Sequence, residues 1–584
     1  MEGDRPFCTF RNIDKRIPRH YDNRKFFLPA EREGKLRFFS YQEHLKGETD
    51  MKRSLLKKLG RTLTLTVLAL TLAISSASAC TTLYVGAHRT DTGTRFVART
   101  EDYGSDMNKL WFISEAGAYP AGTTYLGCPE YGEFEWVFSH DSYRFTYFTN
   151  DIFNGACPEC GQENPTHLSY TEFGTNEKGV SVSATETISG NAEVRAVDPN
   201  VTEKADGKVG IEETDIPTIL LAEAASAREA LDLLLRIYDE YGAYACSGLF
   251  ICDQDEVWYV ENCSGTQYVA IRLNDDLMFL EPNLAVIGLV DLDDTENVVA
   301  SPRLIEVAQQ AGTFVGDAAE NQIDFRASYA NLGTAEAPRV GQPRLVDGLN
   351  FFDAALNCTA EDLAADNTLF TISNVKDGAV VDLYTNIQSD RVVTRNDVFG
   401  YYQLSSIGKP SNQEIEIFEI FADRPAETAT VGWVAVGNMS YNVFVPYYPL
   451  LLNEIYAGYQ VSADTARRVS AAEERPAGFG TFAVNSRTGE SFYVVYPENW
   501  RDSCYFAFEG LGGYIQYAEQ IAGAPVNPEL LTAARARLDA LQDEFAAEFF
   551  AMEPADTSAL GAAMAQKAHE TALELIDLIT NAGL

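Results

Sequence analysis

The sequence has few histidines and lacks the motifs of several common catalytic centres. Only six of its 584 residues are histidine, and it contains no HExxH, no G-x-S-x-G and no GxxxxGK[ST] sequence. These patterns are typical of zinc peptidases, of serine hydrolases with a nucleophile elbow, and of phosphate-binding loops. A papain-like Cys–His pair through His140 or His167 stays open, although neither residue has the local signature of that class.

Basic residues and long apolar runs are also scarce. The chain has 45 Lys and Arg against 85 Asp and Glu, a formal net charge of −40 at pH 7. Since the first 79 residues are net basic, the rest is more acidic still, which argues against nucleic acid or an anionic membrane as a partner. The Cys157–Cys160 CxxC has no second ligand pair at zinc spacing, so we predict no metal or organic cofactor.

Residues 51–79 have the order of regions found in a cleaved signal peptide. A short basic segment beginning at Met51 precedes a mostly apolar run, 62–74, and small residues end the segment at 77–79. The apolar run is too short to span a bilayer as a helix. We therefore predict export, to the medium or to the cell envelope or periplasm, and no membrane attachment of the mature form. Residues 1–50 are either an upstream over-read or a long cytoplasmic n-region.

Cleavage after Ala79 would make Cys80 the first residue of the mature protein. Cys80 would then carry a thiol and an α-amine of pKa about 8 on the same Cα, a nucleophile joined to a base. Two other fates of Cys80 stay open, a disulfide and lipidation, although lipoprotein signals usually have a Leu-like residue where Ala77 stands. Eight further cysteines follow Cys80, and this even number allows up to four disulfides in an exported protein.

The periodicity after residue 80 predicts strand clusters that alternate with helices, typical of an α+β fold. Alternation over 80–100 predicts a β-hairpin whose second strand returns Arg99 and Asp102 toward Cys80. Residues 214–241, 302–312, 528–550 and 559–582 are predicted helices. The other predicted strands are 135–138, 144–148, 179–185, 248–252, 257–262, 268–273, 278–281, 379–384, 414–420, 431–436, 478–485 and 491–496.

An ordered set of short motifs covers most of residues 80–500. The set includes Cys80-Thr-Thr-Leu-Tyr-Val-Gly, Ala98-Arg-Thr-Glu-Asp102, Asn176-Glu-Lys-Gly179, Val257-Trp-Tyr-Val-Glu261, Pro282-Asn283, Pro343-Arg344 and Phe444-Val-Pro-Tyr-Tyr448. It resembles the dipeptidase A family of N-terminal-nucleophile cysteine peptidases, and more distantly penicillin V acylases and conjugated bile acid hydrolases. The resemblance implies one peptidase domain over 80–584, a four-layer αββα sandwich, with a C-terminal helical segment at 527–584.

The resemblance also implies roles for five residues. Cys80 would attack the scissile carbonyl and form a thioester, with its own α-amine as general base. Arg99 would lower the pKa of the thiol, and Asp102 would hold Arg99 or the α-amine. Asn283 would help to line the oxyanion site, and Arg344 would be a supporting cation beside the nucleophile. Spacing alone favours an ordinary surface ion pair at a turn for Arg99 and Asp102, and the position of both residues in the family motif favours the catalytic roles instead.

Glu186 departs from the pattern of the acylase relatives, which have an oxyanion-donating Asn at this position. An ionised Glu186 would repel an oxyanion but would attract the free amine of a dipeptide, so we predict that it binds substrate. The sequence thus predicts an exported cysteine dipeptidase acting on dipeptides or small peptides. Hydrolysis of acyl-amino acids, a catalytically silent exported binding protein, and assembly as a homo-oligomer stay open.

Overall fold

The computed structural model describes residues 80–102, 108–127, 134–151, 171–185, 188–202, 209–333, 343–385, 387, 391–462, 467–470, 479–484, 491–520 and 527–581. These residues belong to one compact unit, 77–584. The predicted signal peptide and Glu186 lie outside the described residues.

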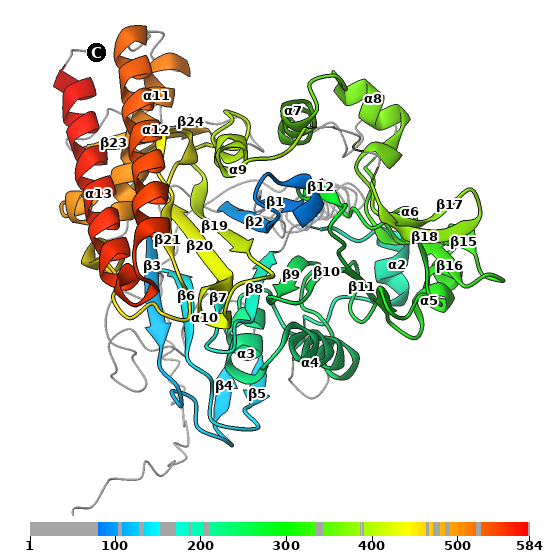
Figure 1. Ribbon diagram of the computed structural model, residues 1–584. Helices are drawn as coiled ribbons and strands as arrows, with labels where there is room; N and C mark the ends of the chain where they lie inside the picture. Colours follow the sequence, from blue (N-terminus) through cyan, green and yellow to red (C-terminus); the bar gives the residue numbers. More distant parts are fainter. Residues whose placement is uncertain are drawn as a thin grey trace, which may run out of the picture. The chain divides into compact units, whose positions relative to one another are not determined.

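Two antiparallel sheets form the centre of the described chain (Figure 1). The first has the strand order β12-β1-β2-β19-β20-β21. Its strands are β1 (Thr81–Val85), β2 (Arg95–Asp102), β12 (Met278–Glu281), β19 (Asn412–Ile420), β20 (Thr430–Val436) and β21 (Val445–Tyr447). The predicted hairpin is confirmed as β1 and β2, with Thr82 opposite Arg99.

The second sheet has the order β14-β11-β10-β9-β8-β7. Its strands are β7 (Phe173–Thr175), β8 (Ser181–Thr185), β9 (Gly248–Cys252), β10 (Val257–Asn262), β11 (Tyr268–Arg272) and β14 (Val298–Ala300). Almost every residue of both sheets is buried, because each sheet is covered on both faces. Strands in such a position read as near-continuous apolar runs, and most of these strands do.

The two sheets pack face to face, and helices cover their outer faces. The ring centroid of Phe279 in β12 lies 6.0 Å from that of Phe250 and 5.1 Å from that of Tyr259, and both of these residues belong to the second sheet. The other face of the second sheet carries α3 (Ile216–Glu223) and α4 (Ala227–Glu240). On the outer face of the first sheet, Trp433 packs against Phe549 of α12, with 6.4 Å between the two ring centroids. The predicted four-layer αββα sandwich is therefore confirmed (Figure 1).

The helices differ from the sequence prediction in several places. The single helix predicted over 214–241 is two helices, because the chain is extended at Ala224 and the Ser226 side chain caps α4 by accepting from the Glu229 N–H. Several helices were not predicted, and the longest of them is α11 (Cys504–Gln520), whose aromatic and glycine residues follow no clear helical period. The C-terminal helices α12 (Pro528–Ala551) and α13 (Thr557–Asn581) are confirmed.

The remaining elements of the described chain connect and flank these layers. The strands are β3 (Lys109–Ser114), β4 (Thr124–Leu126), β5 (Glu135–Val137), β6 (Phe145–Asn150), β13 (Leu289–Asp291), β15 (Gly316–Asp317), β16 (Gln322–Asp324), β17 (Ser373–Lys376), β18 (Ala379–Tyr384), β22 (Arg467–Ser470), β23 (Gly480–Val484) and β24 (Ser491–Val495). The helices are α2 (Ala192–Val197), α5 (Leu304–Ala311), α6 (Phe325–Tyr329), α7 (Pro343–Phe352), α8 (Ala360–Ala365), α9 (Arg395–Tyr402) and α10 (Ala426–Ala429).

The cysteines do not form the full disulfide framework that their number allows. Cys252, Cys263, Cys358 and Cys504 are free, buried thiols. Four disulfides would need all eight cysteines, so that upper limit is wrong for this fold. Cys128, Cys157 and Cys160 lie outside the described residues.

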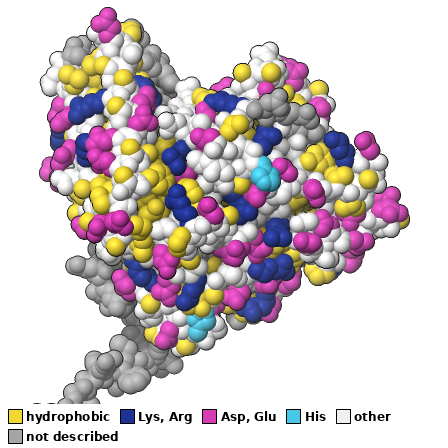
Figure 2. Space-filling model, in the orientation of Figure 1, with side chains coloured by type: hydrophobic (Ala, Val, Ile, Leu, Met, Phe, Trp, Pro, Cys, Tyr) yellow, Lys and Arg dark blue, Asp and Glu magenta, His cyan; other side chains and the backbone are white. Residues whose placement is uncertain are grey.

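The surface carries charges of both signs. On the face in Figure 2, Lys and Arg side chains are scattered among Asp and Glu side chains and form no continuous basic patch. Within the described ranges, no helix combines the length and the apolar character needed to cross a bilayer.

Candidate active site

Cys80 lies directly before β1, at the end of the first sheet where β12 ends. It is fully buried. Nη1 of Arg344 donates to the Cys80 carbonyl oxygen at 2.8 Å, and the hydroxyl of Tyr402 donates to the Thr81 carbonyl at 3.3 Å. The Thr81 N–H donates to Oγ1 of Thr100 at 2.8 Å. These contacts fix the main chain that carries the thiol.

The thiol of Cys80 lies beside the Glu101 carboxylate and the Arg99 guanidinium. Sγ donates to Oε2 of Glu101 at 3.1 Å, and Nη1 of Arg99 lies 2.6 Å from that same oxygen and 3.9 Å from Sγ. Burial, and next the Glu101 charge, raise the pKa of the Cys80 thiol well above its usual value, and Arg99 only partly opposes them. Arg99 therefore lowers the thiol pKa as expected, but burial and Glu101 outweigh its effect.

Arg99 is a buried cation that joins the two sheets. Its Nε donates to Oγ of Ser183 at 2.6 Å and lies 3.2 Å from Oε1 of Glu416, and its Nη2 donates to the Glu172 carbonyl at 3.3 Å. Burial lowers the pKa of Arg99, but the negative charges of Glu416 and Glu101 and of further neighbours raise it by more than burial lowers it. The pKa of Arg99 therefore lies well above its usual value. Arg99 and Asp102 are 1% and 2% exposed, which excludes a surface ion pair.

Asp102, at the end of β2, lies among cationic and amide groups. Nζ of Lys409 is 2.9 Å from its Oδ2, Nδ2 of Asn412 donates to its Oδ1 at 2.5 Å, and Nη1 of Arg344 is 3.9 Å from Oδ2. Arg344 thus contacts both Asp102 and the Cys80 carbonyl. Burial lowers the pKa of Arg344, and Asp102 partly opposes this effect.

Asn283 lies in the loop after β12. Thr82 of β1 pairs with Glu281 of β12, so Asn283 follows the end of β12 at the same end of the sheet as Cys80. It is 6% exposed and has a left-handed φ of 64°. Asparagine is among the few residues other than glycine that adopt this conformation readily. The loop therefore turns sharply at the end of the sheet that carries Cys80.

Residues 79–475 match the model of peptidase family C69. The chain belongs to this family. The probable dipeptidase B of Streptococcus pyogenes serotype M1 is 28% identical over 421 residues, which cover 69% of this chain and 78% of that protein. Dipeptidase A of Lactobacillus helveticus is 26% identical over 375 residues, 63% of this chain and 75% of that protein.

The match places this C69 peptidase among peptide hydrolases, as the sequence motifs predicted. Among solved structures, a mutant conjugated bile acid hydrolase from Clostridium perfringens is similar at 12% identity with a TM-score of 0.25, over 63% of this chain and 96% of that one.

The site of this C69 peptidase contains a group of buried charges that the sequence analysis missed. Its carboxylates belong to Glu101, Glu172, Glu414 and Glu416, and each is fully or almost fully buried. Nζ of Lys109 pairs with Glu172 and lies 3.2 Å from Oε2 of Glu414. We call these four glutamates with Arg99 and Lys109 the buried charge cluster.

Burial raises the pKa of every carboxyl group in the buried charge cluster. For Glu416 burial raises the pKa to about 7 although Arg99 opposes it, and for Glu172 burial and then Glu414 raise it well above the usual value. Lys109 opposes the effect of burial at Glu414. Two cations therefore lie among four carboxyl groups, and burial makes each of these groups easier to protonate than a solvated glutamate.

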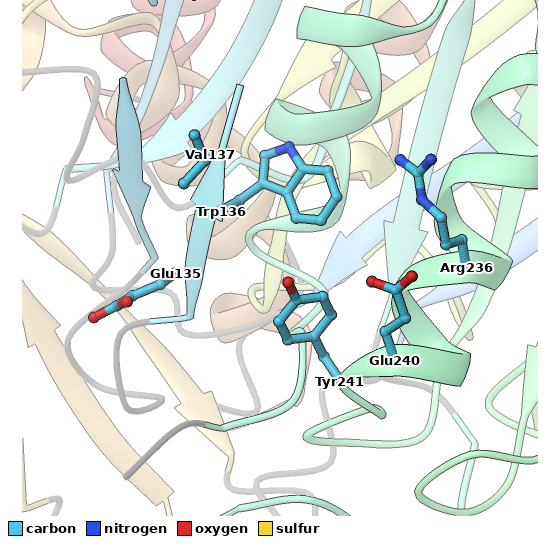
Figure 3. Close-up of a pocket in the computed structure, with 6 residues that line it drawn as sticks. All are labelled: Glu135, Trp136, Val137, Arg236, Glu240 and Tyr241. Atoms are coloured by element: carbon cyan, nitrogen blue, oxygen red, sulfur yellow. The ribbon is translucent and has the colours of Figure 1, made fainter. Parts of the chain in front are cut away.

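A separate cavity of about 380 Å³ lies between β5 and α4 of this C69 peptidase (Figure 3). It is lined by Glu135, Trp136, Val137, Arg236, Glu240 and Tyr241. None of the predicted site residues lines it, so we do not assign it to the reaction.

Proposed function

We propose that this protein is an exported cysteine dipeptidase that uses Cys80 as its N-terminal nucleophile. The observation that carries this proposal is the position of Sγ, 3.1 Å from Glu101 and 3.9 Å from Arg99. Its residue stands one position after the start of the match to a peptidase family. The dipeptidase names of the relatives support the substrate class.

Each proton in the proposed reaction has a carrier. Cleavage after Ala79 releases the α-amine of Cys80, which takes the thiol proton as Sγ attacks the scissile carbonyl carbon. The tetrahedral intermediate collapses when the C–N bond breaks and the α-ammonium donates its proton to the leaving amine, which leaves a thioester. Water then attacks the thioester while the α-amine takes its proton and returns it to the departing sulfur, which releases the acyl part of the substrate as a free acid.

The surrounding charges make this order of events favourable. Because burial and Glu101 keep the resting thiol protonated, proton transfer has to accompany the attack. Arg99 lies beside the sulfur and stabilises the negative charge as it develops. We further propose that the Asn283 amide donates to the oxyanion, that Arg344 and Asp102 hold the Cys80 main chain, and that Glu186 binds the substrate ammonium.

The first test is the mass of the exported protein. We expect its intact mass and N-terminal sequence to begin at an unmodified Cys80, since only a free α-amine can act as the base. The same preparation should hydrolyse a panel of dipeptides faster than acyl-amino acids. Full activity in a protein that retains residues before Cys80, or that carries a lipid on it, would contradict the proposal.

Replacing Glu101 with glutamine should move the titration of the Cys80 thiol to lower pH. The substitution removes the carboxylate that raises the thiol pKa and leaves Arg99 beside the sulfur. The measurement is the pH dependence of inactivation by iodoacetamide, followed through dipeptide hydrolysis. Glu416→Gln is the matched control, because Glu416 also pairs with Arg99 but Sγ donates to Glu101. An unchanged profile in Glu101→Gln would show that Glu101 does not set the thiol pKa.

A further inference from the structure

A small polar cavity lies beside the loop that follows β12. Ser189, Asn283, Arg326 and Asn331 supply its polar lining, and Leu284, Ala285, Ala330 and Leu332 complete it. Its inner volume is about 10 Å³, room for roughly one small polar group. The cavity shares Asn283 with the end of the sheet that carries Cys80.

Arg326 is a buried cation without an anionic partner in the described part of the chain. It lies in α6 and is 3% exposed. Its guanidinium makes no ion pair or hydrogen bond with any described residue, and its Nε is fully buried without a partner. Its guanidinium lies over the ring of Phe370, with Cζ 5.1 Å from the ring centroid. A buried, unpaired guanidinium is costly to a fold unless it serves a ligand.

The acidic groups nearest Arg326 are engaged by other donors. Oδ1 of Asp324 accepts from the Ala327 N–H at 2.8 Å. Oε1 of Glu261 accepts from the Val286 N–H at 2.6 Å and from the Tyr259 hydroxyl at 3.1 Å. Burial lowers the pKa of Arg326, and the charges of Asp324 and Glu261 partly oppose this effect. Both carboxylates therefore keep the guanidinium charged without occupying its donors.

We propose that Arg326 and this cavity bind the free carboxylate of the C-terminal residue of a dipeptide. This inference rests on the proposed function. In a dipeptide only the N–Cα and Cα–C bonds separate the leaving nitrogen from the terminal carboxylate, a reach of about 3 Å. An anion site for that carboxylate must therefore lie close to the nucleophile. Asn283 lines the cavity and follows the end of β12 that pairs with β1 just after Cys80. A guanidinium fork suits a carboxylate better than any other side chain does.

The test compares a dipeptide with the same dipeptide amidated at its C-terminus. The wild-type enzyme should favour the free acid in kcat/KM by about 10- to 100-fold, the usual contribution of a charged hydrogen bond. Arg326→Met should remove this preference by slowing only the free acid. Arg326→Lys should restore part of it, and Arg303→Met, at an arginine whose side chain is 56% exposed, should leave it unchanged.

The outcomes separate this inference from the function on which it rests. A wild-type enzyme that cleaves both substrates equally well overturns the carboxylate site and leaves the dipeptidase intact. Equal loss on both substrates in Arg326→Met, with the preference intact in Arg326→Lys, assigns Arg326 a structural role and overturns the inference too. A wild-type enzyme that cleaves neither substrate overturns both. Unchanged turnover of the amide also shows that Arg326→Met is folded.

Discussion

Replacing Cys80 with alanine should lower kcat for dipeptide hydrolysis by at least about 10³-fold, as expected when a covalent nucleophile is removed. No other group in the described site is placed to form the thioester. The thiol donates to Glu101 and lies within reach of Arg99, whereas alanine leaves both charges facing a methyl group. Steady-state kinetics on one good dipeptide, with the variant's unfolding midpoint measured in parallel, give the result.

Two further variants sharpen this test. Cys80→Ser should also be slow, because a hydroxyl is far less ionised than a thiol, and it should keep the fold. Cys358→Ala is the matched control, since Cys358 is a free thiol that the site does not contact, and it should retain full activity. Dipeptide turnover that survives in Cys80→Ala would place the chemistry on another residue.

The largest loss of stability should follow from replacing Lys109 with methionine. Nζ of Lys109 is the cation between Glu172 and Glu414, and all three side chains are fully buried. Removing one partner of a buried ion pair leaves an uncompensated charge and costs about 3–5 kcal/mol of the free energy of unfolding. Urea unfolding followed by fluorescence measures this loss. Lys178→Met is the control, because its side chain is 41% exposed and its loss should change stability by less than about 0.5 kcal/mol.

The loss in Lys109→Met should depend on pH. The folded-state pKa values of Glu172 and Glu414 are raised above their unfolded values, so each group stabilises the fold most when it is protonated. That stability is fully present below about pH 4.5 and is lost as the pH rises through the folded pKa. Without Lys109 these pKa values rise further, and the variant should be closest to wild type near pH 5 and weakest near pH 8. Lys109→Met combined with Glu414→Gln should recover part of the stability. An equal loss at both pH values would contradict this account.

The sequence could predict the sheet framework because its strands carry local signals. The hairpin of β1 and β2 follows from alternation and from the turn at Gly93, and it brings Arg99 beside Cys80. The family motifs named Arg344, which the structure places on the Cys80 carbonyl. Both contacts could be predicted without knowing the tertiary packing, because a hairpin and an ordered set of motifs can be recognised in a single sequence.

The buried charge cluster could not be predicted in the same way. Glu414 and Glu416 alternate with isoleucines, a pattern that usually marks a strand with one face in solvent. In this fold that face is covered, and the glutamates meet Arg99 of the neighbouring strand β2 and Lys109 of β3. Which strand lies opposite is a property of the tertiary structure. The sequence signal for the buried charge cluster was the repeated glutamate within a strand otherwise rich in isoleucine.

The place of β1 within its sheet bears on how such an enzyme matures. β1 is an inner strand, held by β2 on one side and by β12 on the other. These ladders begin only after Cys80, so trimming the chain in front of it breaks none of them. Under the proposed cleavage after Ala79, precursor and mature enzyme share one scaffold, and activation is a change of a single functional group, from amide to amine, on an already assembled framework.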